Sequence, residues 1–306
     1  MWHVRLDLRY DPQAPAPLPE IEMNSPNRQC LSVRFEGRQR QRLLYGLIAL
    51  AVTGSATAEQ PVGQDEEMRQ HAKLIRIESV TDGRSRVVEL LPKSLLNFSD
   101  PAGTTQSGSL WAWGTTGRPH AIVELSKESI KPGTVRWVEG VTSFSPDLID
   151  ATWDDGQQWR SSKPGLAMKP IADIAAPAES ESERLRQMKV IARTFLVRED
   201  AGPAKGQIQL RLLPNPIHRY SDTASGLRDG AIFVFAYGTN PEAFLIVEAR
   251  SANGSVPAWH YGRARVTGGA LSAKQNDREV WQVAEANPPY TGPSYTNRLR
   301  SPTPSK

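Results

Sequence analysis

The sequence contains an internal repeat, because residues 90–124 recur in degenerate form at residues 212–248. Phe98-Ser99-Asp100 returns as Tyr220-Ser221-Asp222, which sets an offset of 122 residues. The same offset joins Trp111 with Phe233, Trp113 with Phe235, Trp137 with Trp259, Gly140 with Gly262, Asp155 with Asp277 and Trp159 with Trp281. A shift of two residues brings Ile122-Val123-Glu124 onto Ile246-Val247-Glu248. One register kept over about 70 residues predicts two tandem copies of one domain.

Short apolar segments separated by turn residues fill both copies. They are residues 74–77, 86–91, 109–114, 121–125 and 134–141 in the first copy, and 207–213, 231–237, 243–249, 259–266 and 279–283 in the second. Residues 231–237 are apolar at seven successive positions, which predicts a strand that is covered on both faces. Because sustained helical periodicity is lacking, we expect a mainly β protein of two tandem homologous antiparallel β-sandwich or barrel-like domains.

The repeat and the composition divide the chain into five parts. These are an N-terminal extension with a signal peptide (1–58), a first β domain (59–160), a linker (161–189), a second β domain (190–284) and a disordered tail (285–306). The linker is expected from its prolines and its Glu-Ser-Glu-Ser run, and the tail from its Pro, Ser and Thr content. Whether the two copies pack into one body is left open.

Residues 34–58 have the order of a secretory signal peptide. Arginines at positions 34–42 precede an apolar segment at 43–52, and Ala56-Thr57-Ala58 follows, which predicts cleavage after Ala58 and an exported, periplasmic or secreted protein. As a helix, this apolar segment would span about 15 Å of the roughly 30 Å bilayer core, so no stable membrane span is expected after cleavage. An uncleaved membrane tether is the alternative. Because a long segment precedes the apolar run, Met23 is a second candidate start beside Met1.

Charge and cysteine content restrict the partners of the mature protein. Cys30, the single cysteine, lies before the apolar segment, so residues 59–306 can form neither disulfides nor thiolate metal sites. A disulfide-free exported protein of this size favours a bacterial envelope. The chain has 37 Lys and Arg against 33 Asp and Glu, and seven of the former and five of the latter lie in residues 1–58, which leaves a net charge of +2. Near-neutrality without an arginine stripe argues against nucleic acid as a partner.

The recurring aromatic and polar residues supply the few candidate binding positions. Trp111 and Trp113 lie two residues apart, on one face of a strand, and we interpret them as core packing. Trp153 occurs only in the first copy, beside a turn, and is a candidate for stacking on a sugar ring. Ser99-Asp100 and Ser221-Asp222 form the one recurring polar pair, as a candidate binding site or, more simply, as turn-forming residues.

The titratable residues predict no catalytic, cofactor or metal site. His71, His120, His218 and His260 share no spacing across the repeat, so neither a zinc site nor a triad is indicated. We interpret His218 and His260 as partly buried packing residues. The carboxylates Glu124, Glu248, Asp155 and Asp277 recur in pairs that could serve glycoside chemistry, although solvated strand ends and turns are the favoured interpretation.

Part of the second copy resembles a group of uncharacterised exported proteins of planctomycete-type bacteria. The residues that carry the resemblance are 229–235 (DGAIFVF), 238–242 (GTNPE), 259–261 (WHY) and 278–281 (REVW). It covers roughly residues 205–283 and, more faintly, the first copy. The resemblance implies export and a bacterial source, and it brings no activity or catalytic residue.

The sequence therefore predicts an exported envelope protein that is a binding or structural module. Its expected partner is an envelope polymer or another envelope protein, and no cofactor is expected. The alternative is a hydrolase that acts on an envelope or extracellular polymer, with a site between the two domains. That alternative predicts converging carboxylates, or a Ser–His contact in a pocket.

Overall fold

A computed structural model describes residues 62–100, 104–202, 206–251, 256–286, 291–301 and 303–304. The predicted signal peptide, with its cleavage site after Ala58, lies outside these residues. The first half contains α1 (Val62–Ala72), β1 (Ile75–Thr81), β2 (Arg84–Val88), β3 (Leu96–Phe98), β4 (Thr105–Trp113), β5 (Ala121–Lys131), β6 (Thr134–Ser143), β7 (Leu148–Trp153) and β8 (Gln158–Arg160). The short strand β9 (Lys169–Pro170) follows it.

The second half contains a longer helix and a series of strands that corresponds to that of the first half. They are α2 (Glu181–Arg193), β10 (Phe195–Asp200), β11 (Gln207–Gln209), β12 (Arg211–Leu212), β13 (His218–Asp222), the 3-10 turn η1 (Thr223–Ser225), β14 (Leu227–Tyr237), β15 (Asn240–Arg250), β16 (Ala258–Arg265), β17 (Ala270–Gln275) and β18 (Arg278–Val283). The C-terminal strands are β19 (Tyr295–Leu299) and β20 (Thr303–Pro304).

The strands form four antiparallel sheets, and the two halves have the same strand order. The first outer sheet runs β2-β1-β7-β8 and the second β11-β10-β17-β18. The first inner sheet runs β19-β6-β5-β4-β3 and the second β9-β16-β15-β14, with β12 and β13 both paired to β14. The expectation of a mainly β, antiparallel protein is therefore confirmed. A common origin of the halves stays a prediction.

The pairing register follows the offset of 122 residues within the long hairpins. Trp111 lies opposite Val123 as Phe233 lies opposite Leu245. The two-residue shift that matched Glu124 with Glu248 is wrong in this geometry. Glu124 pairs with Gly140, and the pair at the equivalent positions is Ile246 with Gly262. The two Ile-Val-Glu sequences are alike in letters but occupy different places along β5 and β15.

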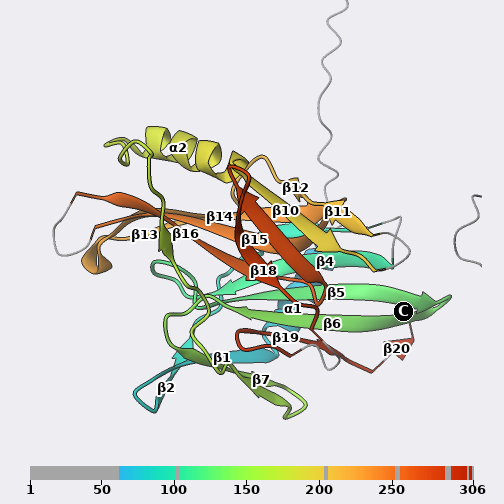
Figure 1. The fold of residues 1–306 in the computed structure, drawn as a ribbon. Helices are drawn as coiled ribbons and strands as arrows, with labels where there is room; N and C mark the ends of the chain where they lie inside the picture. The colour runs from blue at the N-terminus through green and yellow to red at the C-terminus, as the bar shows by residue number, and fades with distance from the viewer. Residues whose placement is uncertain are drawn as a thin grey trace, which may run out of the picture. The chain divides into compact units, whose positions relative to one another are not determined.

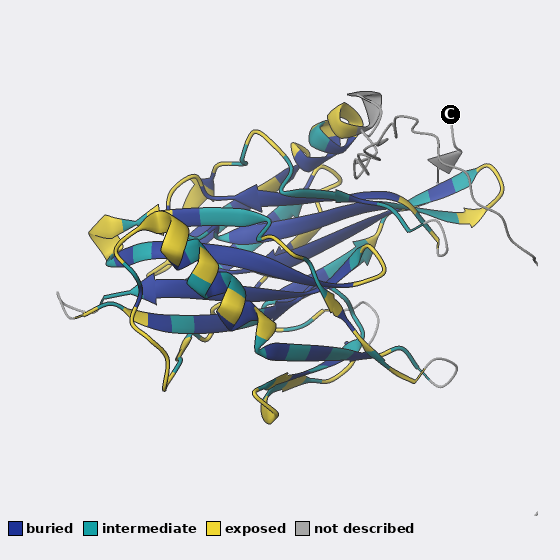
Figure 2. Cartoon of the chain, turned by 90° about the horizontal axis from the view of Figure 1, so that it is seen from above, coloured by how far each residue is buried: buried dark blue, intermediate teal, exposed yellow. Residues whose placement is uncertain are grey.

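Three apolar cores lie between the successive sheets, as the layers in Figure 1 and the buried long strands in Figure 2 indicate. The first lies between the outer and inner sheets of the first half, and another lies at the equivalent place in the second half. The third joins the two inner sheets, where the rings of Phe144 and Phe244 meet edge to face with centroids 5.2 Å apart. The two halves thus share one apolar interface.

Strand β14 shows how the sequence specifies this layering. Phe233 and Phe235 point into the core of the second half, whereas Ile232 and Val234 point into the core between the inner sheets. Because successive side chains of a strand point to opposite faces, a strand buried on both faces must be apolar throughout. The prediction from residues 231–237 is confirmed.

The helices also repeat, although the predicted linker at 161–189 hides the second of them. Ser180 caps α2, since its Oγ accepts a hydrogen bond from the Glu183 backbone N–H at 3.3 Å. Met188 and Ala192 of α2 pack into their core as Met68 and Ala72 of α1 pack into theirs. The predicted linker is wrong from position 181 onward, where α2 begins, two residues before the short helix that the sequence favours at Glu183–Met188.

The prediction of a disordered tail at 285–306 is wrong for β19. This strand pairs with β6, and β9 pairs with β16 in the same way, so each segment that follows one half completes the inner sheet of the other half. The backbone groups of an unpaired edge strand favour a further strand. The polar composition of the tail does not reveal this pairing.

Candidate functional site

An open groove of about 670 Å³ lies in the second half, at the C-terminal end of α2. Its lining comes from the end of α2, from β10, from β11 and β12, and from the turn between β17 and β18. The buried side chains of Phe195, Leu210 and Phe235 lie among the lining residues and belong to the core beneath. The floor of the groove is therefore part of the rigid core, which positions the polar rim.

Three cationic side chains line this groove. Arg193, Arg211 and Lys274 are all exposed, and within the described residues none of them forms an ion pair. Arg211 donates a hydrogen bond from Nη2 to the carbonyl oxygen of Gly238 at 2.8 Å, which holds its guanidinium at the rim. The one acidic residue of the lining is Asp277. The groove consequently carries an excess of positive charge.

The turn at the end of β17 is held in a defined conformation. Asn276 and Asp277 have φ values of 46° and 64°, in the left-handed region that Asn and Asp tolerate better than most residues. The Asn276 backbone N–H donates to the carbonyl oxygen of Thr194 at 3.1 Å, just after α2. The turn and the end of the helix are therefore attached to each other directly within the lining of the groove.

Two of the three cations have no basic counterpart in the first half, whereas Arg193 corresponds to Lys73, because Lys73 follows Ala72 as Arg193 follows Ala192. Glu89 takes the place of Arg211, since Leu90 bridges to Trp113 as Leu212 pairs with Phe235. Thr152 takes the place of Lys274. Thr152 of β7 lies opposite Arg76 of β1, and Lys274 of β17 lies opposite Leu196 at the equivalent position of β10.

The first-half counterpart of the turn is also acidic. Asp154 and Asp155 stand where the second half has Asn276 and Asp277. These two carboxylates are paired with Arg300 and Arg298 of the C-terminal segment, and hydrogen bonding by Arg298 lowers the pKa of Asp155. The cores and strand order agree between the halves, but Glu89, Thr152 and Asp154 stand where the second half has Arg211, Lys274 and Asn276.

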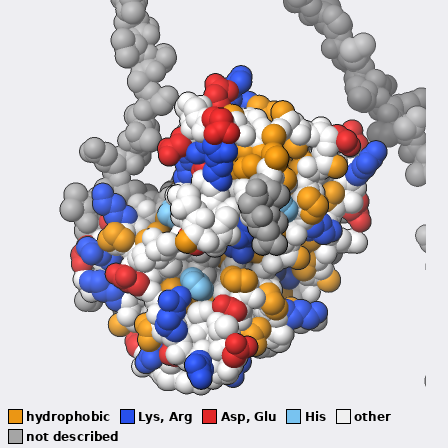
Figure 3. Space-filling model, turned by 90° about the vertical axis from the view of Figure 1, so that its left-hand side faces the viewer, with side chains coloured by type: hydrophobic (Ala, Val, Ile, Leu, Met, Phe, Trp, Pro, Cys, Tyr) orange, Lys and Arg blue, Asp and Glu red, His pale blue; other side chains and the backbone are white. Residues whose placement is uncertain are grey.

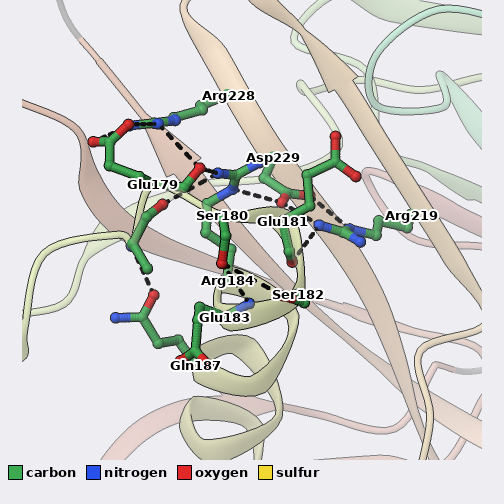
Figure 4. Close-up of polar contacts among 11 residues, drawn as sticks. Glu179, Ser180, Glu181, Ser182, Glu183, Arg184, Gln187, Arg219, Arg228 and Asp229 are labelled. Carbon is green, nitrogen blue, oxygen red and sulfur yellow. Dashed lines mark hydrogen bonds and ion pairs between the residues drawn. The ribbon is translucent and has the colours of Figure 1, made fainter.

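A second polar cluster attaches the N-terminal end of α2 to the sheet (Figure 4). Asp229 of β14 is 3% exposed and accepts from Arg184 of α2 at 2.7 Å and from Arg219 of β13 at 2.6 Å and 2.9 Å. Arg228 binds Glu179 beside it. Each of the three arginines in this cluster forms an ion pair, so the cluster holds the helix on the sheet.

A third cluster lies in the core of the first half. The carboxylate of Glu139, on β6, is fully buried and contacts His71 at 2.5 Å, Arg298 at 2.8 Å and Arg300 at 2.9 Å. The ring of His71 stacks on Trp137 with centroids 3.9 Å apart. The two arginines come from the C-terminal segment, so this cluster attaches that segment to the first half.

Two further carboxyl groups are buried near the ends of β5 and β15. Burial, followed by the charge of Glu128, raises the pKa of Glu124 to about 8. Burial, followed by the charges of Glu199 and then Glu124, raises the pKa of Glu242 to about 9. The interpretation of Glu124 and Glu248 as solvated strand ends is therefore wrong, because the facing sheets cover both. Glu248 is fully buried and accepts from the Tyr220 hydroxyl at 2.8 Å.

A Ser–His contact of the kind that the hydrolase alternative predicts is present in the first half. His120 Nδ1 lies 3.2 Å from Ser145 Oγ, and Asp147 lines a neighbouring recess of about 510 Å³. Ser145 is 1% exposed, and its Oγ accepts the Asp147 backbone N–H at 3.0 Å in a local turn. Burial and the charge of Arg86 lower the pKa of His120. The hydroxyl is enclosed by protein rather than presented to the recess.

Trp153, the candidate sugar-stacking residue, is in the core of the first half. Its side chain is 4% exposed, and the guanidinium of Arg298 lies 4.9 Å from its ring centroid. The burial favours a packing role. The recurring tryptophans Trp111, Trp113, Trp137, Trp159 and Trp259 are buried as well, and Trp281 packs against the second core.

The two Ser-Asp pairs lie at contacts between the halves. The Ser99 carbonyl accepts a hydrogen bond from the Thr239 hydroxyl, and a Cβ on Gly117 would lie 3.1 Å from the Cβ of Asp222. Thr239 and Gly117 are at equivalent positions of the two long hairpins, so the contacts are reciprocal. Asp222 precedes η1 without a side-chain capping bond, and Asp100 receives no side-chain partner among the described residues.

The histidines do not come together. His218 is partly buried, stacks near Tyr220 with centroids 5.7 Å apart, and has a pKa lowered by burial, which agrees with a packing role. His260 is partly exposed and its Nδ1 contacts the carbonyl oxygen of Ala258 at 3.2 Å. Within the described ranges, no group of three or more His, Cys, Asp or Glu side chains could hold a metal ion.

The sequence reasoning did not single out Arg193, Arg211 or Lys274. The three come from separate segments of the chain, and only the fold brings them to one groove. A comparison of charge at the 122-residue offset would have found the reversal at Glu89 and Arg211. On the face drawn in Figure 3, Lys and Arg are interspersed with Asp and Glu.

Comparisons with protein families, with curated proteins and with solved structures give no match to this chain. In the part of the chain that the structure describes, no helix has the length and apolar character needed to cross a membrane.

Proposed function

We propose that this protein is an exported component of a bacterial envelope that works as a binding module, with the groove at the end of α2 as its binding site. One observation carries the proposal. The two halves agree in strand order and in several buried aromatic positions, but Arg211 and Lys274 of the groove stand where the first half has Glu89 and Thr152. A groove that diverges on a maintained scaffold is expected where function acts on the site rather than on the fold.

Export and binding are tested separately. Expression of the full chain in a bacterial host, followed by fractionation and N-terminal sequencing, should give an envelope or secreted product that begins at Glu59. A product that stays in the cytoplasm with its first 58 residues attached would contradict export. For binding, retention of the chain on peptidoglycan and on a panel of envelope polysaccharides is measured, and retention on none of them would contradict a polymer-binding role.

The hydrolase alternative retains one specific observation, the contact between His120 and Ser145 beside the recess that Asp147 lines. A hydrolase of this kind would need the Ser145 hydroxyl to become accessible to substrate. Release of soluble fragments from the same polymers is the test, with Ser145→Ala as the variant. Fragment release that survives Ser145→Ala would exclude this serine as the nucleophile.

A further inference from the structure

The groove has the size and the opening of a site for part of a long ligand. Its volume of about 670 Å³ lies within the roughly 300–1,000 Å³ that is usual for small-molecule sites. The groove is open to solvent, and its lining comes from separate elements of the second half. A polymer that binds there can therefore extend beyond the groove. A short stretch of a polymer is therefore a suitable occupant.

The charges favour an acidic occupant. Arg193, Arg211 and Lys274 line the groove with one acidic residue, Asp277, and Glu279 lies opposite Lys274 on β18, outside the lining. No ion pair within the described residues neutralises the three cations. Exposed charges of one sign in a concave site raise the local concentration of ligands of the opposite sign. The ligand should carry repeated negative charges at intervals that reach more than one cation.

The remaining lining distinguishes between classes of acidic polymer. Gln209 and Asn276 are exposed and uncharged, and their amides can bond to hydroxyl groups. The aromatic residues of the lining, Phe195 and Phe235, are 6% and 2% exposed, so they offer no open ring face. Single-stranded nucleic acids rely on stacking of bases on exposed aromatic side chains, which this groove lacks. A carbohydrate chain, rich in hydroxyls, fits the lining better.

We infer that the groove binds a carboxylate-bearing polysaccharide, with Arg211, Lys274 and Arg193 as the residues that contact its carboxylates. This inference rests on the proposed function as a binding protein and adds the chemical class of the ligand. Because the contacts are between exposed charges, binding should weaken as salt increases.

The internal repeat supplies the variant that tests it. The double substitution Arg211→Glu and Lys274→Thr gives the second half the residues that the first half carries at the same backbone positions, Glu89 and Thr152. Because that backbone accepts those residues in the first half, we expect the variant to fold. Arg84→Glu is the control, since it reverses an exposed charge in the first half, outside the groove. Arg193→Gln is an independent second variant at the end of α2.

The measurement is binding of the full chain to polygalacturonate by calorimetry, with dextran as a neutral polysaccharide and duplex DNA as a different polyanion. We expect binding to polygalacturonate that falls about fivefold or more in the double variant, falls in Arg193→Gln, and stays within about twofold in Arg84→Glu. Equal binding by the double variant and the wild type, or tighter binding to DNA, would overturn the inference. Binding to dextran that the variants do not change would also overturn it, while leaving a polymer-binding function standing.

Discussion

Arg298 Nε lies 2.8 Å from Glu139 Oε2, although the arginine belongs to the C-terminal strand β19 and the glutamate to β6. The two groups form an ion pair by distance, but neither atom has the alignment of a hydrogen bond. Arg300 reaches the other oxygen of the same carboxylate at 2.9 Å. The buried negative charge of Glu139 in the first half is therefore neutralised by two arginines of the C-terminal segment.

Removal of the Glu139 charge should destabilise the protein. In Glu139→Gln, Arg298 and Arg300 lose the buried carboxylate that compensates them, and we expect a loss of about 3 kcal/mol or more in the free energy of unfolding. Chemical denaturation measures it. Glu66→Gln is the control, because Glu66 is 53% exposed in its pair with Arg69 and should change stability by less than about 1 kcal/mol. Equal effects of the two substitutions would contradict a structural role for the buried cluster.

The buried carboxyl groups predict a stability that falls as the pH rises. The folded-state pKa of Glu124 is about 8 and that of Glu242 about 9, against 4.5 as the ordinary value. Because the folded state holds these protons more tightly, the stabilisation is complete below about pH 4.5 and is lost as the pH passes through 8 and 9, at roughly 1.4 kcal/mol per pKa unit. Glu242→Gln should therefore lose less stability than the wild type between about pH 5 and pH 9. Glu285→Gln, at an exposed position, is the control. If the free energy of unfolding of Glu242→Gln and of the wild type changed equally with pH, the titration of Glu242 would not be coupled to stability.

The aromatic contact between the inner sheets should be one of the larger contributions to stability. Phe244 is 1% exposed and meets Phe144 edge to face, so Phe244→Ala should leave a cavity that costs about 3–5 kcal/mol. Thermal and denaturant unfolding measure the loss. Val190, at 53% exposure on α2, supplies the control, and Val190→Ala should cost less than about 0.5 kcal/mol. A small effect of Phe244→Ala would mean that the inner sheets separate more easily than their packing indicates.

The attachment of α2 depends on Asp229. Asp229→Asn removes the charge that binds both Arg184 and Arg219, and it leaves the buried Arg184 without a carboxylate. We expect faster amide exchange in the first turns of α2 and a loss of about 2 kcal/mol or more. Glu179→Gln, in the neighbouring pair with Arg228, is the matched control, since Glu179 is 91% exposed. Unchanged exchange in Asp229→Asn would show that packing alone holds the helix.

The sequence predicts the features that depend on regular packing. The apolar run at 231–237 became a strand buried on both faces, and Trp137 and Trp259 are buried in cores at equivalent positions. Strand β17 was not predicted, because residues 270–275 contain no β-branched or aromatic residue and owe their extended form to pairing with β10 and β18. The extended conformation of such a segment depends on strands with which it pairs, and its own residues do not indicate it.

The errors about polar residues have a different cause. Glu124 and Glu248 were expected in solvent because a glutamate after an apolar run normally ends a strand, and the facing sheet that buries them is not encoded locally. The tail was expected to be disordered from its composition, although the edge of β6 supplies its partner. The groove could not be predicted for the same reason, since Arg193, Arg211 and Lys274 come from three separate elements.

The pairing of β9 with the second inner sheet and of β19 with the first has a consequence for dissection of the chain. A cut between Pro170 and α2 would yield two fragments, and each would carry the terminal strand that the other needs. Each fragment alone would leave one edge of its inner sheet unpaired, but the two together hold every described strand of the intact protein. The molecule is thus suited to split-protein complementation, in which two separately produced pieces regain structure only on mixing.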